Sequence, residues 1–75
     1  MNKLHAAKTM LNTNQRLVQH YNKMVTLYLN DTIHGKSDKS NVIVKIMNET
    51  KDLEITAAVC ALAKIESNKR HKKKD

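Results

Sequence analysis

The side chains able to do chemistry in the first 30 residues are cations and amides, and their pattern favours binding over catalysis. Four cations stand there without a single acid. Lysine and arginine pair with phosphates, while asparagine and glutamine can pair with base edges in a DNA groove. For partner or nucleic-acid binding on this segment we predict Lys8, Asn12, Arg16, Gln19 and Lys23. The solvated face of an ordinary amphipathic helix would look the same, so both interpretations stay open.

A second group of cations lies in residues 69–75, and we predict that it can add phosphate contacts. Its members are Lys69, Arg70, Lys72, Lys73 and Lys74. Such a cluster binds any polyanion without sequence preference, with an affinity that falls as salt is added. Because the segment has nothing apolar to bury, we expect a disordered basic tail. A tail that only solubilises the protein is the alternative.

Patterns for catalysis and metal binding do not occur in the sequence. The four histidines include no pair at the three- or four-residue spacing of a helical metal site. Asp52 and Glu54 are two residues apart, a separation that turns them away from each other on a helix. There is no glycine-rich phosphate loop and no nucleophile elbow. We therefore predict that the protein is not an enzyme and uses no cofactor, metal or small-molecule substrate.

Composition is typical of a small helical protein in a reducing compartment. The 75 residues contain no phenylalanine, tryptophan or proline, so the core must come from aliphatic side chains and two tyrosines. The single cysteine, Cys60, cannot form an internal disulfide. The most apolar run, Ile55 to Ile65, is too short for a membrane span, which takes ~20 residues. We expect no signal peptide and a cytoplasmic location, in the host cell if the gene belongs to a phage.

Residues 4–28 carry the strongest helical pattern. Heptad spacing groups most of the apolar side chains there into one wide seam, which predicts a single helix from about residue 3 to residue 32. Asn2 can cap its start and Gly35 its end. Asn14 falls within the seam. It either fixes the register by pairing with its counterpart in another chain or is a tolerated polar residue.

The polar residues 35–41 predict a loop, and residues 42–68 predict a second helical arm. The β-branched residues at the start of this arm would also suit a strand, but the sequence offers no strand to pair with it. The apolar stripe changes phase across the polar run 48–52. Either one helix drifts around its axis, or a short helix and a longer one meet there, with Thr50 as the cap of the second.

These elements predict an all-α fold, an antiparallel hairpin of two long helices within a single domain of residues 1–68. Both arms carry more apolar surface than one partner helix can cover. We therefore expect either a homodimeric bundle or a partner that binds the remaining apolar surface. For the apolar interface we predict Leu11, Val18, Tyr21, Val25, Ile43, Ile46, Met47, Ile55, Val59 and Leu62.

The function that these features favour is that of a small binding or regulatory protein. It would dock its apolar surface and its cations on a protein partner with an acidic surface. The alternative is a nucleic-acid-binding protein that uses the acid-free first helix and the lysine-rich tail. The size and the lack of catalytic residues would suit an accessory or inhibitor protein of a phage or mobile element.

Overall fold

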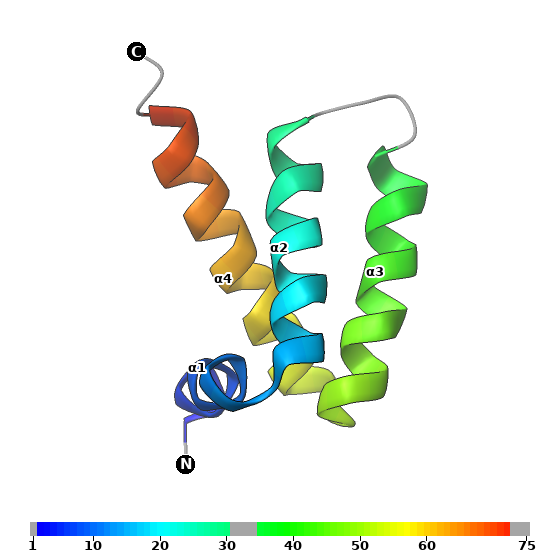
Figure 1. Ribbon diagram of the computed structural model, residues 1–75, viewed down its shortest axis with the longest axis vertical. Helices are drawn as coiled ribbons and strands as arrows, with labels where there is room; N and C mark the ends of the chain where they lie inside the picture. Colours follow the sequence, from blue (N-terminus) through cyan, green and yellow to red (C-terminus); the bar gives the residue numbers. More distant parts are fainter. Residues whose placement is uncertain (1, 31–34, 73–75) are drawn as a thin grey trace.

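The computed structural model describes residues 2–30 and 35–72, and this part of the chain is all-helical, without a strand. Its helices are α1 (Lys3–Thr13), α2 (Gln15–Leu29), α3 (Gly35–Thr50) and α4 (Leu53–Lys72). In Figure 1, α2 and α3 run antiparallel side by side, α4 slants past α2, and α1 lies across the end of the bundle where α2 begins. The all-α prediction is confirmed, but within these residues four helices replace the two predicted long ones.

Asn14 divides the predicted first helix into α1 and α2. Its backbone is extended, with φ −116° and ψ 102°, and its N–H donates to the carbonyl of Met10 at the end of α1. Its side-chain oxygen accepts the N–H of Leu17 at 3.1 Å and so caps the start of α2. Asparagine suits this place because its short amide can supply a hydrogen bond that a helix end lacks. Asn14 is therefore a cap within its own chain, a role that was not predicted from the sequence.

Polar contacts at both ends of α1 hold this helix against the junction between α3 and α4. Lys3 Nζ lies 2.8 Å from a carboxylate oxygen of Asp52. At the other end, Asn14 Nδ2 donates to Glu49 Oε1 at 3.2 Å. The hydrogen bond from Lys3, together with one from the backbone N–H of Ile55, lowers the pKa of Asp52. The position of α1 thus depends on residues 49–52.

The predicted second arm is also two helices, in agreement with one of the two alternatives. α3 ends at Thr50, and Lys51 adopts a left-handed backbone with φ 56°, which glycine takes more easily. Asp52 Oδ1 accepts the N–H of Ile55 at 3.0 Å, so Asp52 and not the predicted Thr50 caps α4. The hydroxyl of Thr50 instead lies 2.7 Å from that of Thr56, inside the buried junction.

The predicted loop 35–41 is helical in the structure, because α3 already begins at Gly35. Asp38 lies in the first turn of α3, where its negative charge is favourable beside the free N–H groups of a helix start. Gly35 therefore does not cap the preceding helix. That helix ends at Leu29, and the N–H of Asn30 donates to the carbonyl of Thr26 at 3.0 Å.

The predicted disordered tail is partly wrong, because α4 continues to Lys72. Arg70 Nε lies 3.0 Å from a carboxylate oxygen of Glu66, and this ion pair spans one turn of the helix. Pairs at this spacing stabilise a helix, and cations are favourable near its C-terminal end. The predicted binding residues Lys73 and Lys74 lie outside the described residues.

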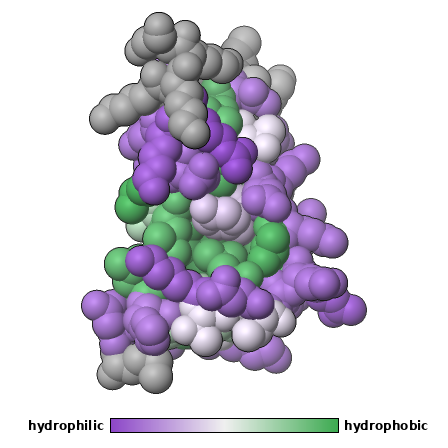
Figure 2. Space-filling view, turned by 60° about the vertical axis from the view of Figure 1, so that its left-hand side comes forward, coloured by the Kyte–Doolittle hydropathy of each residue, from purple (hydrophilic) through white to green (hydrophobic). Residues whose placement is uncertain are grey.

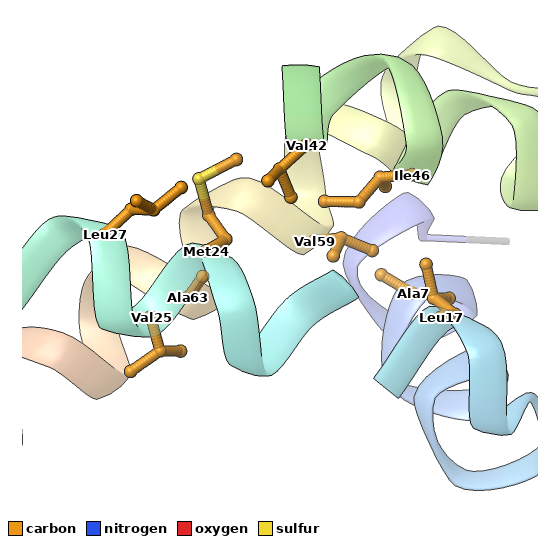
Figure 3. Close-up of a cluster of buried hydrophobic side chains, with 9 residues drawn as sticks. All are labelled: Ala7, Leu17, Met24, Val25, Leu27, Val42, Ile46, Val59 and Ala63. Atoms are coloured by element: carbon orange, nitrogen blue, oxygen red, sulfur yellow. The ribbon is translucent and has the colours of Figure 1, made fainter. Parts of the chain in front are cut away.

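The core lies where the four helices meet; Figure 3 shows Met24 pointing toward Val42 of α3, whereas Val25 points to the other side of α2. The core contains Ala7, Leu17, Met24, Val25, Leu27, Val42, Ile46, Val59 and Ala63. Val25, Ile46 and Val59 were predicted for the interface, but in the structure each is fully buried within one chain. The two helix breaks explain the difference. They let four short helices cover one another's apolar faces, which two long helices could not do.

Candidate binding surfaces

A shallow groove opens between α1, α2 and α4, around a volume of about 370 Å³. Leu11, Tyr21 and Leu62 line it and are half-buried, and the exposed Lys8 and Asn12 lie beside them. Figure 2 looks onto this side of the molecule and shows a hollowed hydrophobic patch with hydrophilic side chains around it. We call this feature the apolar groove. Its three half-buried side chains come from three helices, so the folded bundle is needed to form it.

Tyr21 gives the apolar groove one polar group. Burial raises the pKa of its hydroxyl, and the nearby Glu66 raises it further, while Arg70 opposes this effect. The phenol therefore stays protonated at neutral pH and can donate a hydrogen bond. With Lys8 beside it, the groove offers a mainly apolar lining, one hydroxyl donor and one cation.

The five polar residues predicted on the first helix lie on two separate surfaces. Lys8 and Asn12 line the apolar groove, whereas the other three are exposed on the outer side of α2. Gln19 and Tyr21 show this division, because residues two positions apart are separated by about 200° around a helix. The break at Asn14 ends the continuous polar face that the sequence predicted. The outer face of α2 exposes Gln15, Arg16, Gln19, Asn22, Lys23 and Thr26.

The predicted apolar interface is likewise divided. Leu11, Tyr21 and Leu62 meet in the apolar groove. Val18, Met47 and Ile55 are half-buried, and Ile43 is 38% exposed. The prediction missed other apolar side chains that are more exposed, namely Val44 at 59%, Leu53 at 72% and Ile65 at 50%. The spacing of three residues from Leu62 is a signal that could have added Ile65.

A second hollow, of about 320 Å³, is lined by residues from the last turn of α2, the second turn of α3 and the C-terminal half of α4. Lys39 Nζ lies 4.9 Å and Lys64 Nζ 5.0 Å from the centroid of the half-buried Tyr28 ring. Burial raises the pKa of this tyrosine. The rest of the lining is Leu29, Ser67, Asn68 and His71. We call this feature the basic hollow. This hollow could not be predicted from the sequence, because only the fold brings residues 28, 39 and 64 together.

The remaining predicted cations lie at the end of α4. Lys69 and Arg70 are exposed on its last turns, and Arg70 is engaged with Glu66. The side chain of Lys72 is not among those that the structure describes. Lys69 and Arg70 do not line the apolar groove or the basic hollow.

Residues 2–30 and 35–72 contain no group of three or more histidine, cysteine or acidic side chains placed to hold a metal ion. In the same residues, each helix is too short or too polar to cross a membrane. The chain matches no protein-family model, no curated protein and no solved structure.

Proposed function

We propose that the chain is a small helical binding protein whose apolar groove holds an amphipathic helix of a protein partner. The observation that supports this proposal is the groove itself, in which half-buried Leu11, Tyr21 and Leu62 remain open to solvent. A groove of this kind accepts the apolar face of a helix, and tyrosine is enriched at the centres of protein interfaces. Recognition would therefore come from apolar contacts at the middle of the groove.

The charge of the chain defines the expected polar side of that partner. The formal charge is +7, and Lys8 beside the groove has no carboxylate within 4.0 Å among the described residues. A partner helix that carries acidic residues along the edge of its apolar face would pair with Lys8. It would also be attracted over longer distances by the net positive charge.

Nucleic-acid binding is the second candidate, and the outer face of α2 supports it. Arg16, Gln19 and Lys23 are exposed there, and neither α1 nor α2 contains an acid. Such a face can contact phosphates with its cations and base edges with its amides. It lies on the other side of α2 from Tyr21, so the two candidate functions use different surfaces and can be tested separately.

A photo-crosslinking amino acid, placed at Asn12 or at Asn22, separates the two candidates. Both positions are exposed asparagines, but the first lines the apolar groove and the second lies on the outer face of α2. In a lysate of the producing cell, we expect the probe at position 12 to crosslink one discrete protein, with and without nuclease. The probe at position 22 should not crosslink that protein.

Charge reversal checks that the crosslinked protein is a true occupant of the groove. Lys8→Glu should reduce crosslinking from position 12 at least fivefold, whereas Lys45→Glu, on the exposed side of α3, should leave it unchanged. Crosslinking to nucleic acid from position 22, with nothing bound at position 12, would instead favour the second candidate. If Lys8→Glu and Lys45→Glu reduced crosslinking from position 12 equally, the groove would have no specific role in binding.

Three further expectations from the sequence stay predictions. The homodimer would have to use exposed apolar residues such as Val44 and Leu53, since Val25, Ile46 and Val59 belong to the core of one chain. The non-enzymatic character rests on the sequence pattern. The suggested phage or mobile-element origin rests on size and composition alone.

A further inference from the structure

The positive charge of the basic hollow is not balanced within the described residues. Lys39 and Lys64 come from different helices and converge on the ring of Tyr28. Neither lysine has a described carboxylate within 4.0 Å, and none of the described residues that line the hollow is acidic. The contact with the ring offsets part of the repulsion between the two ammonium groups. An anion between them would offset more, because it would attract both groups at once.

The polar groups around the two lysines indicate which anion fits. Asn68 and His71 line the hollow and can each donate a hydrogen bond. The hydroxyl of Ser67 is already engaged, since it donates to the carbonyl of Lys64 at 2.8 Å. A phosphate group has several acceptor oxygens and more than one negative charge at neutral pH, so it can pair with both lysines and with these donors. A single carboxylate offers fewer acceptors and less charge.

We propose that the basic hollow binds the phosphate group of a small ligand, held between Lys39 and Lys64 with the ring of Tyr28 beside it. The volume of about 320 Å³ has room for a phosphate and a small attached group. Leu62 of the apolar groove and Lys64 are two residues apart on α4, so they point to opposite sides of the helix. The phosphate site is therefore separate from the groove and does not depend on the proposed protein partner.

Phosphate binding can be measured on the whole chain by two-dimensional ¹⁵N NMR. Pyrophosphate is titrated at constant ionic strength, with sodium chloride as the reference salt. We expect saturable shifts of the backbone amides of Lys64, Ser67 and Asn68, with a dissociation constant in the millimolar range or below. Lys39→Gln and Lys64→Gln should each weaken binding at least threefold, and the double substitution at least tenfold. Lys45→Gln removes the same charge from the exposed side of α3 and should change the constant less than twofold.

The same titration contains the results that would overturn the proposal. If the lysines only hold the end of the bundle together, their removal will alter stability, but the pyrophosphate shifts will not saturate in any variant. Shifts that spread over all basic surfaces, or that fall equally with Lys45→Gln, would mean unspecific screening. Tighter binding of a single-stranded oligonucleotide than of pyrophosphate, lost with the same two substitutions, would assign the hollow to a nucleic-acid backbone and not to a small ligand.

Discussion

Each of the two helix breaks in this protein ends one helix and begins the next, but the two breaks do so with different residues and hydrogen bonds. Between α1 and α2 a single residue, Asn14, ends one helix through its backbone and starts the next through its side chain. Between α3 and α4 the chain uses Lys51 in a left-handed conformation, Asp52 as the cap and a buried pair of threonine hydroxyls. The first break depends on one side chain, whereas the second divides the task among several. Substitutions at the two breaks should therefore change the free energy of unfolding by different amounts and even in opposite directions.

The largest effect is expected from Asn14→Ala, which removes the cap of α2 and the hydrogen bond to Glu49 together. We expect the free energy of unfolding to fall by about 2 kcal/mol, as measured by urea denaturation. Asn12→Ala, at an exposed position on α1, should change it by less than about 0.5 kcal/mol. Equal effects of the two substitutions would show that the break does not depend on the asparagine cap.

Lys51→Gly should act in the opposite direction at the second break. Glycine adopts a positive φ without the steric conflict that lysine has there, so we expect the protein to gain about 1 kcal/mol of stability. The matched control is Lys45→Gly in the middle of α3, which should lose about 1 kcal/mol. Thermal or urea unfolding measures both changes. A loss of stability in both variants would contradict the left-handed conformation of Lys51.

The smallest effect concerns the charge of Asp52, which the ammonium of Lys3 keeps ionised below the ordinary pKa of 3.8. A lowered folded-state pKa contributes stability that is fully present above the unfolded-state pKa and is lost as the pH falls through the folded-state value. Asp52→Asn keeps a residue that can cap α4 but removes this titration. The wild type should therefore be more stable than this variant at pH 7, and the difference should vanish as the pH falls below about 4.

Lys3→Gln provides the control for the charge of Asp52. Without the ammonium group, Asp52→Asn should change stability at pH 7 less than it does in the wild type. Urea denaturation of the four proteins at several pH values measures both trends. A difference between wild type and Asp52→Asn that persists unchanged at low pH would mean that the ion pair contributes nothing to folding.

The same comparison shows how far the fold could be predicted from the sequence. The all-α class follows from periodicity and composition, and the second break was one of two alternatives because the apolar stripe changes phase across residues 48–52. The first break leaves no such sign. Leu11 and Val18 stay seven residues apart across Asn14, so a heptad count continues through the cap as if the helix were unbroken.

The candidate sites were less predictable because they depend on the breaks. Lys8, Leu11, Tyr21 and Leu62 were all predicted as binding residues, but their grouping into one groove requires α1 to turn across the bundle at Asn14. Lys39 and Lys64 were not predicted at all. They are isolated lysines in the sequence, and only the packing of α3 and α4 on α2 brings both to the ring of Tyr28.

The contacts of α1 have a consequence for the order in which the molecule forms. Lys3 and Asn14 bond with residues 49 and 35 positions further along the chain. Such distant pairs are slow to form, and a ribosome releases the N-terminal partner long before the C-terminal one. We therefore expect α1 to dock last, after α4 has been synthesised. Until then its apolar face has no cover, so the nascent chain has an exposed hydrophobic segment and no finished groove.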